Sequence, residues 1–136
     1  MSEPHVFPVR VYYEDTDAGG IVYYANYLKY AERARTEMLR DVGIESSVLM
    51  ARDNMALTVK TCHVDYKKSA KLDDALEVHT RVTKIGGASL EGEQLIKRDG
   101  NELVVIQIKL ACMALDGKPT RMPKGLRSTL DELVEE

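Results

Sequence analysis

The chain has 136 residues, of which 44% are hydrophobic and 30% are charged, which is the length and composition of one ordinary globular domain. The net charge of −3 provides no broad basic surface, so nucleic acid is not an expected partner. The first residues form neither an apolar signal core nor an Arg-rich presequence, and no apolar run approaches the ~20 residues that span a bilayer. We therefore expect a single domain over residues 1–136, located in the cytoplasm and without a transmembrane segment.

Cysteine and histidine positions argue against a disulfide framework and against a metal site. Cys62 and Cys112 lie far apart in the sequence and form no CxxC pair, which fits a reducing compartment. His5, His63 and His79 do not have the spacing of metal ligands. No metal and no redox cofactor is therefore expected.

The first third of the chain predicts one strand and two helices. Apolar and polar residues alternate over residues 9–14, which indicates a strand, and Pro8 should lie at its start or on a sheet edge. The acids and glycines of residues 15–20 indicate a loop. Apolar residues at three- and four-residue spacing predict a long helix over residues 24–42, ended by Gly43, and Ser46 or Ser47 can cap a short helix that extends to Arg52.

The remainder of the chain predicts strands. We expect them over residues 56–66, 75–85, 89–98 and 102–113, with hairpin turns at residues 86–87 and 99–101. The apolar phase changes within residues 56–66, which indicates a β-bulge, and the last strand is apolar on both faces, which is typical of a central strand or an interface. Residues 128–131 resemble a capping box that opens a C-terminal helix.

These elements predict an α+β fold in which one antiparallel sheet buries one long helix. A single helix covers only one face of a sheet. The other face and any open edge strand must meet water or another subunit, so we expect at least a dimer.

Asp17 is the side chain best placed for chemistry. It lies in a glycine-flanked loop, where the backbone can approach a ligand closely, just before the long helix. The helix start near Tyr24 offers unpaired N–H groups and the positive end of the helix dipole, which favour a developing oxyanion. Thioester hydrolysis needs such an arrangement, because the carboxylate can attack the carbonyl or deprotonate a water. The alternative is that Asp17 forms an Asx-turn or caps the helix, and Asp15 and Glu14 are rival carboxylates.

Six of the seven tyrosines lie between Tyr12 and Tyr30. Such a run can line a ligand pocket. It can equally pack the helix onto the sheet, because aromatic side chains dominate protein cores.

The segment YEDTDAGGIVYYANY at residues 13–27, continued by YAERAR at residues 30–35, resembles the hotdog-fold acyl-CoA thioesterases. It is most similar to the Tol–Pal-associated (YbgC-type) branch of the 4-hydroxybenzoyl-CoA thioesterase family. The later segments VDY at residues 64–66 and AKLDD at residues 70–74 also resemble that branch, so the likeness covers most of the chain. The resemblance implies a hotdog fold, in which a five-stranded antiparallel sheet wraps one long central helix.

The resemblance also implies catalytic roles. Asp17 would be the nucleophile or the general base, the backbone N–H of Tyr24 would polarise the thioester carbonyl, and Gly20 would lie close to the substrate. Some members of the YbgC-type branch have His where this chain has Tyr24, which matches the hydroxybenzoyl-type enzymes instead. A backbone role survives that change, whereas the preferred acyl group stays open.

Substrate contacts are implied for a second set of residues. Glu32 corresponds to an acid that meets the acyl group in members with aromatic substrates, and an ion pair with Lys29, Arg33 or Arg35 is its alternative role. Tyr27 belongs to the tyrosine run that can line a pocket. The cations Lys67, Lys68 and Lys71 suit the phosphates of CoA, with a solvated loop as the alternative.

The expected function is hydrolysis of an acyl-CoA, or of an acyl carrier protein thioester, in a pocket between the subunits of a homodimer or homotetramer, without a cofactor. One alternative is a non-catalytic hotdog protein that binds an acyl ligand or a partner in an envelope or lipid-synthesis complex. A hotdog dehydratase is disfavoured, because those enzymes pair a catalytic His with an acid on the helix and this helix has no His.

Overall fold

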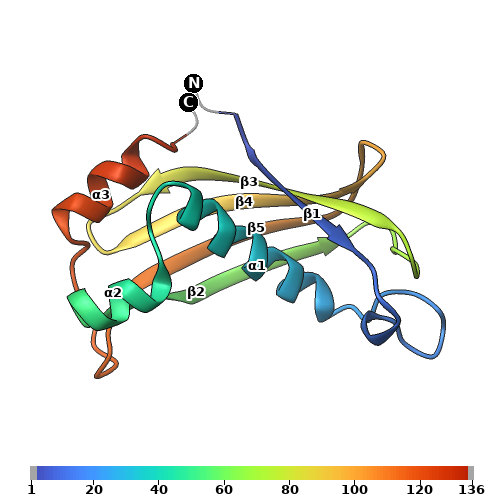
Figure 1. Ribbon diagram of the computed structural model, residues 1–136, viewed down its shortest axis with the longest axis horizontal. Coiled ribbons are helices and arrows are strands. Elements are labelled where there is room, and N and C mark those ends of the chain that lie inside the picture. The colour runs from blue at the N-terminus through green and yellow to red at the C-terminus, as the bar shows by residue number, and fades with distance from the viewer. Residues whose placement is uncertain (1–2, 135–136) are drawn as a thin grey trace.

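The computed structural model describes residues 3–134, which form one five-stranded sheet and three α-helices (Figure 1). Along the chain the elements are β1 (His5–Arg10), the 3₁₀ turn η1 (Tyr13–Asp15), α1 (Asn26–Asp41), α2 (Ser46–Asp53), β2 (Met55–Tyr66), β3 (Ala75–Ile85), β4 (Ser89–Arg98), β5 (Asn101–Ala114) and α3 (Lys124–Asp131). The strand order is β1-β3-β4-β5-β2, and every neighbouring pair is antiparallel.

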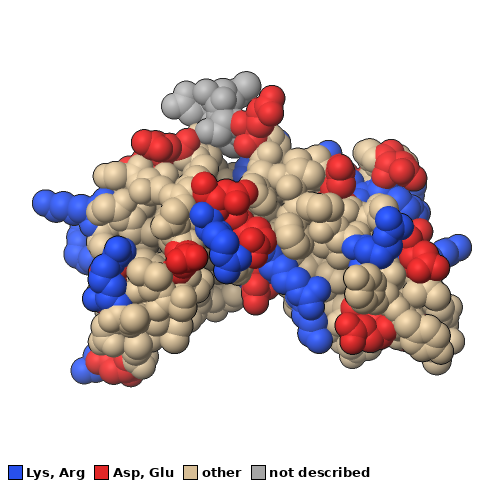
Figure 2. Space-filling model, viewed as in Figure 1, with Lys and Arg blue, Asp and Glu red and all other residues tan. Residues whose placement is uncertain are grey.

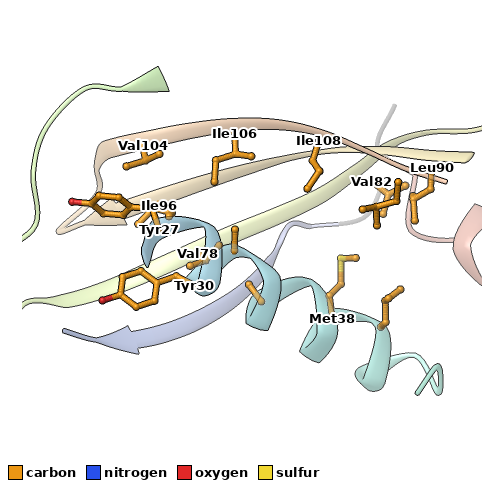
Figure 3. Close-up of a cluster of buried hydrophobic side chains, with 14 of the residues drawn as sticks. Tyr27, Tyr30, Met38, Val78, Val82, Leu90, Ile96, Val104, Ile106 and Ile108 are labelled. Carbon is orange, nitrogen blue, oxygen red and sulfur yellow. The ribbon is translucent and has the colours of Figure 1, made fainter. Parts of the chain in front are cut away.

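The hydrophobic core lies between α1 and the inner face of the sheet (Figure 3). Tyr30, Ala31, Ala34 and Met38 follow one stripe of α1 and are buried. Alternate residues of the strands meet them, among them Val78, Val82, Ile96, Val104, Ile106 and Ile108. The expected α+β class, with one long helix on a five-stranded antiparallel sheet, is confirmed.

The long helix lies where its apolar spacing places it, but it is shorter at both ends than expected. It covers Asn26–Asp41 rather than residues 24–42, and Gly43 follows with φ of +86°, the left-handed conformation that favours glycine at a helix end. The short helix α2 extends one residue past Arg52 and begins at Ser46, after Glu45.

The first strand lies earlier in the chain than the sequence pattern predicts. β1 covers His5–Arg10, whereas residues 11–14 leave the sheet. The regular pairing ends with Arg10 opposite Ala75, the first residue of β3. Val11 still exchanges backbone hydrogen bonds with Asp74 and Asp73, and the chain then leaves the sheet. The Asp15 carboxylate then accepts the Tyr12 N–H at 2.8 Å and closes a 3₁₀ turn. Pro8 lies on an edge strand, as expected.

The later strands agree closely with the sequence pattern, and the bulge in β2 is confirmed by a register shift between Val59 and Thr61. The expected start of the C-terminal helix is wrong. The helix begins at Lys124, directly after Pro123, and Ser128 lies inside it. The position of this helix is determined by the burial of Leu126 and Leu130, which lie four residues apart on one face, and not by a capping box.

The two sheet edges differ. β1 is short and carries Pro8, whereas β2 is twelve residues long and exposes the side chains of residues 58–63. Figure 1 places α2 beside one end of β2 and the loops of residues 11–25 beyond the other end. Each end of this open strand carries a cavity, and these two cavities hold most of the expected site residues.

Candidate active site

Asp17 lies in a small hairpin formed by residues 15–23. The Tyr23 N–H donates to the Asp15 carbonyl at 2.9 Å, and the Asp17 N–H donates to the Ile21 carbonyl at 2.9 Å. The Gly20 N–H returns to the Asp17 carbonyl at 3.0 Å, with Gly20 at φ of +81°. Gly20 therefore closes the turn, because this conformation is rarely open to a residue with a side chain.

The Asp17 carboxylate forms the Asx-turn that the sequence analysis gave as its alternative role, and one of its oxygens has no hydrogen-bond partner within residues 3–134. Its Oδ1 accepts the Gly19 N–H at 2.8 Å, which is the Asx-turn expected as the alternative. Its Oδ2 accepts no hydrogen bond from residues 3–134. One oxygen thus orients the side chain, and the other is available to a ligand.

Asp17 faces a cavity of about 240 Å³, called here the Asp17 cavity. Its walls come from the hairpin, the start of α1, the end of β2 and the loop that follows β2. They consist of Asp17, Ile21, Val22, Tyr24, Tyr27, Tyr66, Lys67, Lys68 and Ser69. Asp17, Tyr24, Tyr27, Lys67 and Lys68, all expected from the sequence to form the site, are therefore brought together. The other four lining residues, among them Tyr66, were not expected there.

The backbone before α1 leaves donors for a ligand. The N–H of Val22 donates to Ala70 at 2.9 Å, and that of Tyr23 donates to Asp15. The N–H of Tyr24, two residues before the helix, donates to no acceptor among residues 3–134. An N–H at this position adds to the positive end of the helix dipole and can stabilise an oxyanion.

Aromatic rings form one wall of the Asp17 cavity. The Tyr66 ring lies 6.0 Å from the Tyr24 ring and 5.8 Å from the Tyr27 ring, measured between centroids. Tyr27 is only 3% exposed, so its ring belongs to the core as well as to the cavity. Burial raises the pKa of the Tyr27 phenol, although the N–H of Ala70, which donates to its oxygen at 2.9 Å, lowers it. A phenol with a raised pKa stays neutral and does not act as a base near neutral pH.

The expected cations divide into two groups. Lys67 and Lys68 line the Asp17 cavity, and the N–H groups of both donate to the Leu103 carbonyl. The Lys67 ammonium also lies 3.3 Å from the Glu102 carboxylate. Lys71 lies outside the cavity lining. Its backbone forms a β-bridge with Ile21, which joins the loop after β2 to the hairpin.

Glu32 lies elsewhere, in a cavity of about 330 Å³ between α1, α2 and the start of β2, called here the Glu32 cavity. Its Oε2 accepts the Thr36 hydroxyl at 3.0 Å, and no cation among residues 3–134 lies within ion-pair distance of it. Apolar side chains form much of this lining, namely Leu39, Leu49, Met50, Leu57, Val59 and Leu110.

Tyr66 and Arg35 are among the cavity residues that the sequence analysis did not predict. Tyr66 is separated from the other tyrosines by more than thirty residues, and the signals for it were its alternation with Val64 and its place in the VDY segment at residues 64–66. Arg35 lines the Glu32 cavity beneath α1, where its guanidinium donates to the buried Gln94 side chain at 3.0 Å. Burial lowers the pKa of Arg35. The sheet covers Arg35 on the helix, and the apolar spacing along the helix alone does not predict that this charged residue is buried.

The described part of the chain contains neither a candidate metal site nor a helix that could cross a membrane. Within residues 3–134 no three His, Cys, Asp or Glu side chains are grouped so that they could hold a metal ion. No helix in the same range has the length and apolar character needed to cross a membrane.

Comparison with known proteins agrees with the resemblance in the motif. The chain matches the thioesterase-like superfamily over residues 11–130. It is 45% identical over 128 residues to the acyl-CoA thioesterase YbgC of Haemophilus influenzae, covering 93% of this chain and 94% of that protein. It is 44% identical over 122 residues to the acyl-CoA thioester hydrolase YbgC of Escherichia coli, covering 88% and 90%.

A solved structure gives the same result at the level of the fold. The crystal structure of a protein from Aquifex aeolicus superposes with a TM-score of 0.87 and 28% identity, covering 93% of this chain and 99% of that one. With the family match over residues 11–130 and relatives above 40% identity over most of their length, the chain belongs to the thioesterase-like superfamily, in its YbgC-type branch.

Proposed function

We propose that the protein is an acyl-CoA thioesterase that hydrolyses its substrate to a free acid and CoA. The observation that carries the proposal is the Asp17 cavity, which is lined by both Asp17 and Tyr24. One carboxylate oxygen of Asp17 and the N–H of Tyr24 have no hydrogen-bond partner within residues 3–134. The names of the Haemophilus and Escherichia relatives support the same activity.

The reaction follows from these two groups. The thioester oxygen accepts the Tyr24 N–H, which stabilises the negative charge that develops on it. The free oxygen of Asp17 either attacks the carbonyl carbon, forming a mixed anhydride that water then hydrolyses to restore Asp17, or removes a proton from a water that attacks the carbonyl carbon. In both routes the carbon–sulfur bond breaks, the CoA thiolate leaves and takes up a proton, and water supplies the oxygen of the new acid. The glycine turn at Gly20 lets the substrate pass close to the backbone.

Cation and aromatic positions support CoA as the carrier. Lys67 and Lys68 stand at the Asp17 cavity and suit phosphate groups, with Lys71 further along the same loop. The rings of Tyr27 and Tyr66 form the adjacent wall. An acyl carrier protein thioester is the second carrier that we propose for test.

The exposed free thiol of Cys62 fits the reducing conditions of the cytoplasm.

We also propose that two copies pair through β2. This edge is long and open, and exposed edges of this kind are normally covered or paired. In an antiparallel pair of β2 strands, the end of one strand lies beside the start of the other. The Asp17 cavity of one copy then adjoins the Glu32 cavity of the other, so Glu32 and its apolar neighbours are available to the acyl group.

Charges of both signs are interspersed on the face seen in Figure 2, so neither sign dominates it.

The test of this function is thiol release from a panel of short-chain, long-chain and aromatic acyl-CoAs, with matching acyl carrier protein thioesters. We expect turnover of at least one CoA thioester, and the preferred substrate will show which length and type of acyl group the pocket accepts. If no thiol is released from any of them while the same protein binds acyl-CoA, the chain is a binding protein and the proposal is wrong.

A further inference from the structure

Asn26, the first residue of α1, is buried, with 9% of its surface exposed. Within residues 3–134 it is one of three buried polar residues, together with Thr80 and Gln94. Buried amides are normally hydrogen-bonded, because an unpaired one loses its bonds to water. The Asn26 Nδ2 donates to the Asp15 carbonyl at 2.9 Å, eleven residues back in the sequence.

That hydrogen bond reaches the base of the Asp17 hairpin. The same Asp15 carbonyl accepts the Tyr23 N–H at 2.9 Å, and the next pair along the hairpin is the β-bridge between Thr16 and Val22. Asp17 follows directly, tied by its N–H to Ile21. A shift of the Asp15 carbonyl is therefore passed through two backbone pairs to Asp17.

The backbone of Asn26 holds the other half of the site. Its N–H donates to the Tyr23 carbonyl at 2.8 Å, so the residue before Tyr24 is fixed on one side by Asn26 and on the other by Asp15. One residue thus connects the peptide that carries the Tyr24 N–H with the hairpin that carries the Asp17 carboxylate. These are the two groups that must face the thioester together.

We propose that Asn26 is a positioning residue for thioester hydrolysis, which sets the Asp17 carboxylate relative to the Tyr24 N–H without touching the substrate. The proposal rests on the role of Asp17 proposed above. The role requires a donor at this position, because the Asp15 carbonyl can only accept. Aspartate has nearly the same shape as asparagine, but its ionised form offers no donor and repels the carbonyl.

A pH-dependent comparison separates positioning from general stability. The carboxyl introduced by Asn26→Asp regains an O–H donor when it is protonated, so the hydrogen bond returns at low pH, whereas Asn26→Ala has no donor at any pH. The titratable and charged groups on the segments that meet here come from the hairpin, α1, the end of β2, the loop that follows it and β4, namely Asp15, Asp17, Tyr23, Tyr24, Tyr27, Tyr30, Tyr66, Lys67, Lys68, Lys71, Asp74 and Arg98. They are present in every variant, so each variant's kcat is divided by that of the wild type at the same pH, and Asn26→Ala, which adds no charge beside them, controls for their own titration.

The experiment measures kcat and KM with the best acyl-CoA from pH 5 to pH 8. At pH 8 we expect kcat to fall about 10- to 100-fold for both Asn26 variants, the size of effect seen when reacting groups are misplaced, with KM changed less than about threefold. As the pH falls, the kcat ratio should rise toward one for Asn26→Asp and stay low for Asn26→Ala. Thr80→Val removes a buried hydroxyl on β3 that accepts from the Gln94 side-chain amide, and should keep wild-type kcat.

Several results would overturn the proposal. Wild-type kcat in both Asn26 variants, a change confined to KM, or a ratio for Asn26→Asp that does not depend on pH would each do so. Loss of folded protein in thermal unfolding, with normal kcat per folded molecule, would assign Asn26 a purely structural role. Asp17→Asn in the same assay keeps the two proposals apart. Wild-type kcat in Asp17→Asn contradicts the role of Asp17, whereas a large loss there with unaffected Asn26 variants contradicts only the role of Asn26.

Discussion

At the scale of single residues, the loop after β2 is held to the sheet by Asp74 and Arg98. The Asp74 Oδ2 lies 2.6 Å from the Arg98 guanidinium and accepts the Lys71 N–H at 2.8 Å. Partial burial by itself raises the pKa of Asp74, but the Lys71 N–H and the Arg98 guanidinium together bring the pKa below its ordinary value. Arg98 also donates to the Ser69 carbonyl at 3.3 Å, so this pair supports the wall of the Asp17 cavity.

This pair gives a pH-dependent stability. A carboxyl whose pKa is lower in the folded state stabilises the fold above its unfolded pKa of about 3.9, and this contribution disappears as the pH falls through the lower folded value. Asp74→Asn should lower the free energy of unfolding by about 1 kcal/mol at pH 7, since both side chains are partly exposed, and by progressively less below about pH 4. Urea unfolding at several pH values measures this, with Asp73→Asn, an exposed neighbour, as the control. An equal loss at pH 3 and pH 7 would contradict the assignment.

Most of the site residues that the sequence predicts belong to one contiguous segment, and Lys67 and Lys68 are the exceptions. Asp17, Gly20 and Tyr24 belong to one strand–loop–helix connection, so their proximity follows from local structure. Tyr66, Arg35 and the bond from Asn26 to Asp15 depend on how the sheet and helix pack, which no local pattern describes. For the same reason Glu32, only fifteen residues after Asp17, lies in a different cavity.

At the scale of elements, β4 requires a glycine where β3 bulges. The register between these strands shifts between Val82 and Lys84, and Gly92 lies opposite Val82. A Cβ atom built on Gly92 would lie 2.9 Å from the backbone carbonyl oxygen of Arg81, which cannot rotate away as a side chain can. The glycine is thus needed for close approach of two strands.

Gly92→Ala should therefore lower the free energy of unfolding by about 1–3 kcal/mol, the usual range for overpacking in a core. Gly125→Ala is the matched control, because no atom lies within 4 Å of a Cβ there and alanine favours the helix that contains it. Urea unfolding of the two variants beside the wild type measures both effects. Equal stabilities for Gly92→Ala and the wild type would show that β3 moves to accommodate the methyl group.

Helices and strands with a clear hydrophobic periodicity are predicted well from the sequence. Where some of them end is determined by the elements that they pack or pair with. β3 and β4 have the bounds expected from alternation and turn residues, and the β2 bulge follows from a change of apolar phase. The end of β1 is set by where β3 begins, and the start of α3 by Pro123 and by the packing of Leu126 and Leu130. Those limits come from tertiary contacts, so the alternation that continues to residue 14 is misleading.

At the scale of the whole molecule, the open edge of β2 predicts pairing with a second copy. Cys62 lies near the middle of this strand and is exposed, whereas Cys112 is buried. In an antiparallel pair centred on the strand, the two Cys62 thiols lie close together. A short bifunctional maleimide should convert the protein to covalent dimers at low micromolar concentration, and Cys62→Ser should give none. Sedimentation that shows a monomer at these concentrations, with no cross-linked product, would contradict the pairing.

The proposed role of the Asp17 carboxylate in hydrolysis is tested by kcat/KM of Asp17→Asn, measured beside the wild type and Glu14→Gln. Glu14 is an exposed carboxylate three residues away, so Glu14→Gln makes the same change of charge outside the Asp17 cavity. With the best acyl-CoA of the panel, we expect Asp17→Asn to lose at least about 100-fold while it remains folded, which is the size of an acid–base contribution, and Glu14→Gln to stay near wild type. Wild-type activity in folded Asp17→Asn would contradict the account, and an equal loss in both variants would trace the effect to charge near the hairpin rather than to Asp17.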